Sequence, residues 1–399
     1  MVQLIWTAFM LNFFVVSALT AETFEIYIDA DYSISRDAAE SIELGVSTAL
    51  SQSDFGSDIE IIPKNHRGNV RRSFRTMKEF LKNDRALVMI GGLHSPPYLT
   101  HRDFINKNEL LLLLPWSAAG PVTRSAAGDQ NWIFRLSVDD FKTAPFFIRE
   151  TLDHGNCKNL ALVLIDTGWG RANFTSLTEG LDNRAEGIAI VRFFSASIGE
   201  ASAQLLAEDV ARSGADCAVL LANWDSGAVV VNALSNRTPD LRIFSHWGIL
   251  GGAFAEQVSH ETRKGVDLRV LQTCGLQKQA DGSSILSDAV RAAGLGGAAL
   301  NDIPASTGFV HGYDLTRILM ASIKQARATP EWGGDIIAKR RAVRMALENL
   351  NAPIHGILKS YSAPFLHYTP ETPDAHEALG LDDLCMAVFE ADGRLSLTQ

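Results

Sequence analysis

The sequence has no long run of basic residues. It contains 36 lysines and arginines against 46 aspartates and glutamates, so its formal net charge at pH 7 is −10. The two basic clusters, Arg71-Arg72 and 339–341, are short. Nucleic acids and anionic membranes attract proteins that concentrate positive charge on one surface. The sequence therefore predicts that neither is a partner of this protein.

The sequence also lacks the short motifs of common metal and hydrolase sites. There is no Cys-x-x-Cys pair and no His-Glu-x-x-His, so we expect no metal site. Ser95 follows His94, but no Gly-x-Ser-x-Gly turn exposes a nucleophile. His311 and Asp314 are spaced to share one helix face, which equally suits an ordinary helix. We expect a protein that is not an enzyme and that uses no cofactor.

Long hydrophobic runs are absent except at the start of the chain. Residues 1–21, MVQLIWTAFMLNFFVVSALTA, have an apolar core of the length of a secretory signal peptide, followed by small residues. No Lys or Arg precedes that core, so an uncleaved anchor helix is the alternative. No later run is long and apolar enough to span a bilayer. We predict a signal peptide over 1–21 and an exported protein.

Short apolar runs alternate with helix-length segments along the rest of the chain. The runs at 86–90 and 110–114 are closed by Gly or Pro and separated by a helical segment at 98–108. Such runs are typical of parallel strands buried on both faces. The succession starts again after Asp139, so the pattern predicts two α/β lobes. The predicted strands are 24–29, 58–63, 86–90, 110–114, 160–166, 188–194, 217–222 and 242–245, and the predicted helices are 37–51, 69–83, 98–108, 141–154, 173–183, 201–213, 226–236, 311–326 and 340–350.

Three motifs in the first half of the chain resemble those of a known family. They are IGGLHS (90–95), LLPWSAAGPVT (113–123) and WIFRLS (132–137), in that order. This succession resembles the branched-chain amino-acid (Leu/Ile/Val)-type periplasmic binding proteins, and the resemblance covers nearly all of the chain after residue 21. It implies the type I periplasmic binding fold, in which two Rossmann-like lobes with parallel sheets are joined by a three-segment hinge.

The resemblance also implies how the chain is divided. Lobe 1 would comprise 22–136 plus 274–362, and lobe 2 would comprise 137–273 plus 363–399. The crossings between lobes are expected at 132–137, 268–273 and 357–365, and a final hairpin at 386–393 would form an edge of lobe 2. Three crossings make a hinge that can close around a ligand.

The chain has four cysteines, at 157, 217, 274 and 385. In the strand order that the resemblance implies, the strands next to Cys157 and Cys217 would be neighbours, so a disulfide between them is one alternative. Buried free thiols are the other alternative, and the one that we favour.

The position of the tryptophans is the most informative feature for a binding site. Four of the seven lie one to four residues beyond the carboxyl end of a predicted strand, namely Trp116, Trp169, Trp224 and Trp247. Ligands of parallel sheets bind beyond those ends, so these indoles are expected to wall one pocket. The alternative is that some of them only cover the surface of a lobe.

The resemblance assigns further ligand contacts. In the family, the loops after the third and fourth strands hold a carboxylate by backbone N–H and hydroxyl groups. The matching residues are Ser95, Ser117, Ala118 and Ala119. The aromatic residue of the second lobe that stacks on the ligand matches Trp169, and the next contacts fall near Asn223 and Trp224.

One departure bears on the ligand. The acid that clamps an amino group in the family should follow the strand ending at Ser245, where this sequence has His246-Trp247-Gly248. Asp225 or Asp302 could replace it. An aromatic or apolar carboxylate therefore fits the tryptophans better than an amino-acid-like compound.

The function that the resemblance implies is capture of a small metabolite in the periplasm. The cleft between the lobes would hold the ligand, and a monomeric binding protein would deliver it to an ABC transporter permease in the inner membrane. The alternative is a ligand-sensing module that presents its ligand state to a signalling partner.

Overall fold

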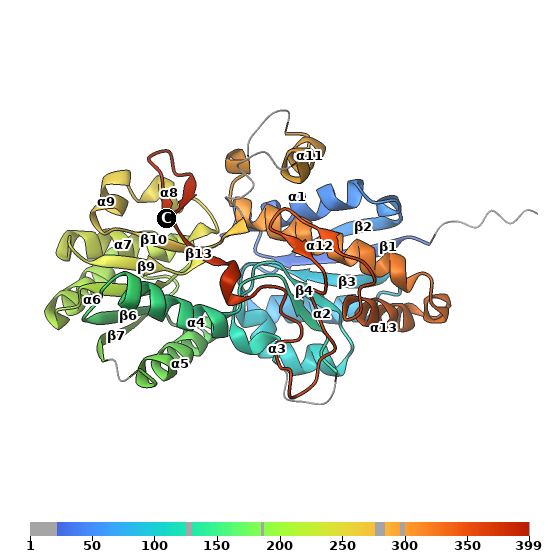
Figure 1. The fold of residues 1–399 in the computed structure, drawn as a ribbon, viewed down its shortest axis with the longest axis horizontal. Coiled ribbons are helices and arrows are strands. Elements are labelled where there is room, and N and C mark those ends of the chain that lie inside the picture. Colours follow the sequence, from blue (N-terminus) through green and yellow to red (C-terminus); the bar gives the residue numbers. More distant parts are fainter. Residues whose placement is uncertain (1–21, 125–129, 185–186, 276–283, 296–299, 399) are drawn as a thin grey trace, which may run out of the picture.

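The computed structural model describes residues 22–124, 130–184, 187–275, 284–295 and 300–398. They form two α/β lobes that lie end to end (Figure 1). The predicted signal peptide, 1–21, lies outside the described residues. Within the described ranges, no helix is both long and apolar enough to cross a membrane.

The first lobe is built on a parallel five-stranded sheet with the order β2-β1-β3-β4-β5. Its strands are β1 (Phe24–Ala30), β2 (Ile59–Asn65), β3 (Ala86–Gly91), β4 (Leu112–Leu114) and β5 (Ile133–Arg135). Every residue of β1, β3, β4 and β5 is buried, as expected when helices cover both faces of a parallel sheet. The helices of this lobe are α1 (Arg36–Ser51), α2 (Val70–Leu81), α3 (Pro96–Lys107), α11 (Ser284–Ala292), α12 (Ser306–Ala326) and α13 (Ile336–Leu347).

Helix α12 returns the chain from the second lobe onto the first, where it packs along α1 (Figure 1). The two backbones approach so closely that only glycine fits at the contact. A Cβ atom on Gly45 would collide with the carbonyl oxygen of Phe309, and one on Gly312 would lie 2.8 Å from the carbonyl oxygen of Ile42. This close packing fixes a distant segment of the sequence to the first lobe.

The second lobe is built on a seven-stranded sheet with the order β14-β13-β10-β9-β8-β6-β7. Its parallel strands are β6 (Leu160–Ile165), β7 (Ile188–Phe194), β8 (Cys217–Leu221), β9 (Arg242–Ser245) and β10 (Arg269–Thr273). The predicted edge hairpin is confirmed, because β13 (Leu384–Phe389) and β14 (Leu395–Leu397) pair antiparallel at the margin of this sheet. The helices are α4 (Asp140–Ile148), continued by one π-helical turn (Arg149–His154), then α5 (Gly168–Asp182), α6 (Glu200–Ser213), α7 (Trp224–Arg237), α8 (Phe254–Gln257) and α9 (His260–Gly265).

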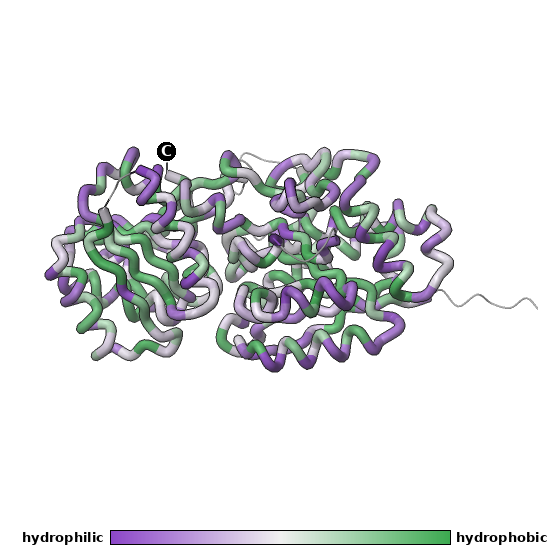
Figure 2. The backbone as a smooth tube through the Cα atoms, turned by 90° about the horizontal axis from the view of Figure 1, so that it is seen from below, coloured by the Kyte–Doolittle hydropathy of each residue, from purple (hydrophilic) through white to green (hydrophobic). Residues whose placement is uncertain are grey.

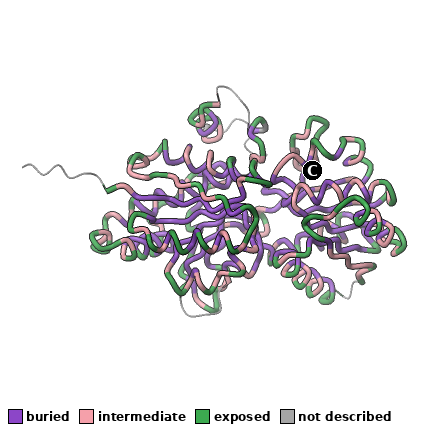
Figure 3. The backbone as a smooth tube through the Cα atoms, turned by 180° about the vertical axis from the view of Figure 1, so that it is seen from behind, coloured by how far each residue is buried: buried purple, intermediate pink, exposed green. Residues whose placement is uncertain are grey.

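Hydropathy and burial follow the same layers. Hydrophobic residues gather in the central strands, whereas the covering helices carry hydrophilic residues on their outer faces (Figure 2). The central strands are buried in both lobes, whereas the edge strands β2, β7 and β14 are only partly buried, and most exposed residues lie on the helices and loops (Figure 3). The two cores explain why short, almost wholly apolar runs predicted the strands correctly.

Several helices begin earlier than the sequence pattern predicts, and two of these starts carry predicted site residues. Helix α5 starts at Gly168 rather than at 173, because the side chain of Thr167 accepts a hydrogen bond from Gly170 N and so caps the helix. Helix α7 starts at Trp224 rather than at 226. Trp169 and Trp224 therefore lie in the first turn of a helix and not in a loop.

The third crossing lies further along the chain than 357–365. After the short hairpin β11 (Ile354–His355) and β12 (Ser360–Tyr361), the chain stays beside β5. Phe365 packs edge to face on the buried ring of Phe134, and His376 stacks on the same ring at 3.8 Å between centroids. Glu377 then pairs with Arg135 of β5. The chain reaches the second sheet only at β13, because these contacts hold 365–377 on the first lobe.

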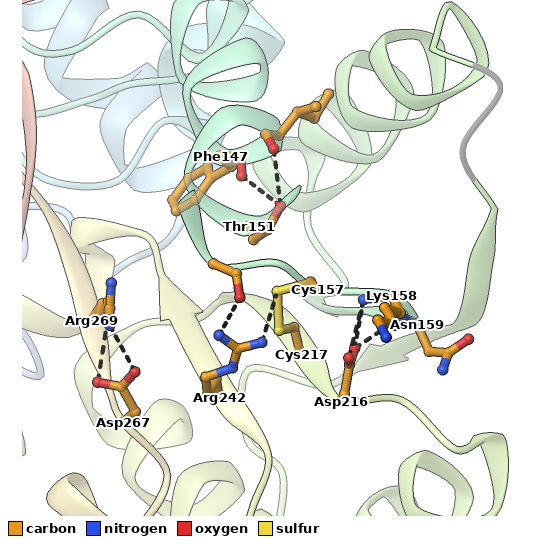
Figure 4. The surroundings of a disulfide bond; sticks show 12 residues. Phe147, Thr151, Cys157, Lys158, Asn159, Asp216, Cys217, Arg242, Asp267 and Arg269 are labelled. Atoms are coloured by element: carbon orange, nitrogen blue, oxygen red, sulfur yellow. Dashed lines mark hydrogen bonds and ion pairs between the residues drawn. A yellow bond between two sulfur atoms is a disulfide. The ribbon is translucent and has the colours of Figure 1, made fainter. Parts of the chain in front are cut away.

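The expectation of free thiols is wrong, because all four cysteines are paired. Cys157, just before β6, is bonded to Cys217 at the start of β8, and these strands are neighbours in the sheet. Around this bond, Arg242 donates to the carbonyl oxygen of Gly155 and approaches Cys157 Sγ, while Asp216 accepts from the backbone of Lys158 (Figure 4). The second bond joins Cys274, after β10, to Cys385 in β13.

Candidate functional site

A cavity of about 340 Å³ lies between the two lobes. Its walls come from the segments after strands β1 to β4 in the first lobe and after β6 to β9 in the second. These are the carboxyl ends of the parallel strands, where ligands of open α/β sheets bind. The cavity is therefore the candidate site.

Six of the nine residues that the sequence singled out lie on the cavity wall, namely Ser95, Trp116, Ala118, Trp169, Asn223 and Trp247. The structure brings them together from five different loops and helix starts. The other three, Ser117, Ala119 and Trp224, do not line the cavity.

Ser117 and Ala119 instead hold the two first-lobe loops together. The hydroxyl of Ser117 is buried and donates to the carbonyl oxygen of Gly92 at 2.7 Å. The N–H of Ala119 donates to Ser95 Oγ at 3.2 Å. Both groups that the resemblance offered to a carboxylate are thus used within the protein, and they position the loop that carries Ala118.

Trp224 lies near the cavity and connects the lobes. Its Nε1 donates to the carbonyl oxygen of Ile34 in the first lobe at 3.2 Å. Ile34, which is 56% exposed, lines the cavity on the opposite side. This hydrogen bond joins α7 to the segment between β1 and α1 across the space between the lobes.

The other three predicted indoles form an aromatic wall. Trp116 and Trp247 are almost fully buried and meet edge to face, with ring centroids 6.0 Å apart. Trp169 lies beside them and is 8% exposed. Trp116 Nε1 is buried and has no hydrogen-bond partner among the described residues. A buried donor without a partner is costly, which makes this N–H an unusual feature of a residue of the cavity wall.

Three helices begin at the cavity wall. Ser95 precedes α3, Thr167 precedes α5 and Asn223 precedes α7, and all three residues line the cavity. The backbone N–H groups and the dipole at such helix ends favour an anion. These three helix ends therefore favour a ligand that carries negative charge.

Charged side chains that the sequence analysis did not single out also line the first-lobe side. Asp31 follows β1 and lies 3.3 Å from His94 Nε2. Burial alone would raise the pKa of Asp31, but hydrogen bonds from His94 and from the backbone of Ser33 and Ile34 lower it to about 2. Arg67 follows β2 in a left-handed turn, with φ of 51°. Asp31 and Arg67 lie one and two residues after the end of a strand. This position in the sequence would have identified them as candidate site residues.

The structure also shows what replaces the expected amino-group clamp. His246 is fully buried and its Nε2 lies 2.8 Å from Asp140 Oδ1. Its ring therefore bonds within the protein and does not line the cavity. Of the two candidate substitutes, Asp225 lines the cavity. Asp302 lines a separate groove on the molecule. Of these two, Asp225 is the one on the cavity wall, where Asp31 is a second carboxylate.

A buried ionic cluster at the hinge bonds to the loop that carries Ala118 of the cavity wall. Arg135 donates to the carbonyl oxygens of Ala118 and Ala119 at 2.6 and 2.8 Å. It also pairs with Asp139 at 2.9 Å and with Glu377 at 2.6 Å. One arginine thus ties the cavity loop after β4 to the first and third crossing segments. In the described part of the chain, no three His, Cys, Asp or Glu side chains are grouped to hold a metal ion.

Comparisons with known proteins agree with this architecture. No curated protein sequence matches the chain. Among solved structures, an extracellular ligand-binding receptor from Rhodopseudomonas palustris aligns with a TM-score of 0.75 and 16% identity, over 94% of this chain and 99% of the other. A solute-binding protein of an ABC transporter from R. palustris, in complex with benzoate, aligns with a TM-score of 0.72 and 12% identity, over 94% and 95%.

A leucine binding protein from Thermotoga maritima is similar to the same extent, with a TM-score of 0.71 and 12% identity over 94% of this chain and 98% of the other. At such identities these neighbours support the fold alone. A family profile described as periplasmic binding protein matches residues 31–357, which is most of the chain. This protein, with its two α/β lobes around a cleft, therefore belongs to the periplasmic binding protein family.

Proposed function

We propose that this protein is exported to the periplasm, captures a small aromatic or apolar carboxylate in the interlobe cavity, and delivers it to an ABC transporter permease. It acts as a monomer and performs no covalent chemistry. Residues 1–21 serve as the signal peptide. The ligand contacts are Ser95, Trp116, Ala118, Trp169, Asn223 and Trp247.

The observation that carries this proposal is the pairing of an aromatic wall with unsatisfied or anion-favouring N–H groups. Trp116, Trp169 and Trp247 offer apolar ring surface, and Trp116 Nε1 offers a buried donor. Three helix starts face the same space. An aromatic or apolar body with a carboxylate is complementary to both features.

The size of the cavity and the ligands of similar proteins support the same class. A volume of about 340 Å³ is at the lower end of the range of ligand pockets, about 300–1,000 Å³, and suits a small metabolite. One structural neighbour was solved with benzoate, and another is a leucine binding protein. Asp225 on the wall keeps an amino-acid-like ligand as the second candidate.

Ligand capture would use the hinge between the lobes. We assign 22–136 and 274–362 to the first lobe and 137–273 to the second, and we place 363–379 with the first lobe because it packs on β5. Residues 380–399 then complete the second lobe. Closure of the lobes would be favoured by a ligand that contacts both walls, since it binds the closed state more tightly than the open one.

The test is a binding screen on purified residues 22–399. Melting temperature and tryptophan fluorescence are followed against benzoate, 4-hydroxybenzoate, leucine, other amino acids, aliphatic carboxylates, amides and alcohols. A ligand that binds only the native state raises the melting temperature by mass action. We expect an aromatic or apolar carboxylate to raise it and to change the fluorescence.

Two tryptophan variants make this screen specific. Trp169→Ala should abolish the response, because it removes one wall of the cavity. Trp332→Ala is the matched control, since this half-buried indole packs on Phe24 in the first lobe and is not on the cavity wall. No response from any compound, or an equal loss in both variants, would refute the proposed site.

Delivery needs its own experiment. Uptake of the radiolabelled ligand is measured in spheroplasts that carry the candidate permease, with and without added purified protein. We expect uptake to depend on the protein and to fail with Trp169→Ala. Ligand binding without any uptake would instead support the sensing alternative.

A further inference from the structure

We propose that Asp140 is a positioning residue that couples the hinge to the cavity, holding a first-lobe loop with its backbone and the second-lobe aromatic wall with its carboxylate. The inference rests on the proposed function only for the role of the cavity as the ligand site. Asp140 is 1% exposed and is the first residue of α4, directly after the first crossing between the lobes.

The backbone of Asp140 faces the first lobe. Its N–H donates to the carbonyl oxygen of Ala118, a residue of the cavity wall, at 3.1 Å. The same oxygen accepts from Arg135 Nη1. The preceding residue, Asp139, caps α4 by accepting from Phe141 N and pairs with Arg135. The start of α4 is therefore fixed to the loop that follows β4.

The carboxylate of Asp140 faces the second lobe. Its Oδ2 accepts from Trp169 Nε1 at 2.8 Å and from Asn173 Nδ2 at 2.6 Å, and its Oδ1 lies 2.8 Å from His246 Nε2. Trp169 lines the cavity, and His246 immediately precedes Trp247, which also lines it. One carboxylate thus sets the position of an indole from α5 and of the segment after β9.

These bonds are strengthened by charge. Burial by itself would raise the pKa of Asp140, but the charge and hydrogen bond of His246, with the hydrogen bond of Asn173, hold it below its ordinary value. The group is therefore ionised at neutral pH. Hydrogen bonds to an ionised acceptor are roughly twice as strong as neutral ones. Trp169 is held in one orientation before any ligand arrives.

Adjacent side chains consequently contact different lobes. Asp139 pairs with Arg124 and Arg135 of the first lobe, whereas Asp140 holds Trp169 and His246 of the second. The chain between the lobes passes through this pair. A wall that is fixed in advance lowers the ordering cost of binding, which is how Asp140 would raise ligand affinity without touching the ligand.

The first test needs no ligand. In ¹⁵N-labelled protein, the indole N–H signal of Trp169 is assigned by its loss in Trp169→Phe. Asp140→Ala should shift this signal upfield and speed its exchange with solvent, because its charged acceptor is gone. Asp209→Ala removes a half-buried carboxylate of α6 that pairs with Arg192 and Arg212, away from both walls, and it should leave the signal unchanged. An unchanged Trp169 signal in folded Asp140→Ala would overturn the proposal.

The second test uses benzoate as the probe in a double-mutant cycle. Asp140→Ala should weaken binding about tenfold, the equivalent of one charge-assisted hydrogen bond. In a Trp169→Phe background, which has no indole N–H to hold, the same change should cost about threefold or less. Equal losses in both backgrounds would show that Asp140 does not act through Trp169.

Two precautions keep the outcomes distinct. If Asp140→Ala does not fold, Asp140→Asn preserves the shape and one acceptor oxygen, and an intermediate shift of the Trp169 signal is expected. If benzoate does not bind, the ligand-free spectra still decide the role of Asp140. The positioning role and the proposed ligand class therefore fail separately.

Discussion

The indole rings of Trp116 and Trp247 meet edge to face at 6.0 Å between centroids, although they come from opposite lobes. Trp116 follows β4 of the first sheet, and Trp247 follows β9 of the second. Trp247 also packs against His311 of α12, at 5.3 Å between ring centroids. An aromatic contact between the lobes thus forms part of the cavity wall, and its Trp116 N–H has no partner among the described residues.

Trp116→Phe should separate ligand recognition from stability. The phenyl ring keeps most of the apolar surface but removes the unpaired Nε1–H. We expect the free energy of unfolding to change by only about 1 kcal/mol, since losing the orphaned donor offsets part of the lost packing. Affinity for a carboxylate ligand should fall about fivefold to tenfold.

Urea unfolding and titration calorimetry measure these two effects. Trp132→Phe is the control, because Trp132 is equally buried but lies away from the cavity, against Arg344. It should leave the affinity unchanged. Unaltered ligand binding by Trp116→Phe would contradict the role assigned to its N–H.

The bond between Cys157 and Cys217 should act on stability alone. It closes a loop with a sequence separation of 60 inside the second lobe. Replacing both cysteines with serine should lower the free energy of unfolding by about 2–4 kcal/mol, because the unfolded chain gains conformational freedom. Thermal unfolding of the oxidised protein and of the double variant checks this. A melting temperature that does not change would indicate that the bond is absent in solution.

The bond between Cys274 and Cys385 should also restrain the hinge. Cys274 follows β10, where the chain leaves the second lobe, and Cys385 lies in β13, where it returns. Replacing this pair with serine should broaden the distribution of distances between dyes placed on the two lobes, as measured by single-molecule energy transfer. The Cys157/Cys217 double variant is the matched control and should lose stability without broadening. Identical distributions in both variants would argue against a restraint on the hinge.

The contribution of Asp29 to stability should fall as pH rises from about 4 to about 7. This carboxyl lies at the end of β1, fully buried, with Oδ1 lacking a partner among the described residues. Burial raises its pKa from 3.8 to about 7, despite hydrogen bonds from Ser73, Thr76 and Tyr98 that lower it. Between about pH 4 and pH 7 the folded state holds a proton that the unfolded state has released. Raising the pH therefore favours unfolding, by up to about 1.4 kcal/mol per pH unit.

Urea unfolding at pH 5 and pH 8 tests this dependence. Asp29→Asn should stabilise the protein relative to wild type, by an amount that grows between pH 5 and pH 8. Other buried groups add their own pH dependence to both proteins, since burial raises the pKa of Asp314 to about 6 and lowers that of His311 to about 4. Asp54→Asn, at an exposed ion pair, should behave as wild type. An Asp29→Asn curve parallel to that of wild type would contradict the prediction.

Several features were predictable because they depend on short stretches of chain. Apolar runs closed by Gly or Pro located the strands, and β7 and β9 have the predicted boundaries. The carboxyl-end rule for parallel sheets then brought Trp116, Trp169 and Trp247 to one cavity. Asp31 and Arg67 lie in the same way after β1 and β2, so the same rule would have located them.

Other features depend on contacts between distant segments. The third crossing lies nearer residue 380 than predicted, because Phe365, His376 and Glu377 contact β5. No local pattern in the sequence indicates those contacts. The hydroxyl of Ser117 was expected to meet a ligand, yet it donates its hydrogen bond to the carbonyl oxygen of Gly92. Likewise, nothing near Asp140 in the sequence indicates Trp169 or His246 as its partners.

The sequence by itself determined the two α/β lobes, the direction of their strands and the family, because alternation of apolar runs and helices is set by local hydrophobic periodicity. Only the tertiary structure decided which polar groups remain available to a ligand. Hydrogen bonds form between groups that are near in space rather than in sequence. Ser117 and His246 therefore bond to other groups of the protein, whereas Trp116 Nε1 has no partner among the described residues. Both disulfides were decided in the same way, by strands that the fold places side by side.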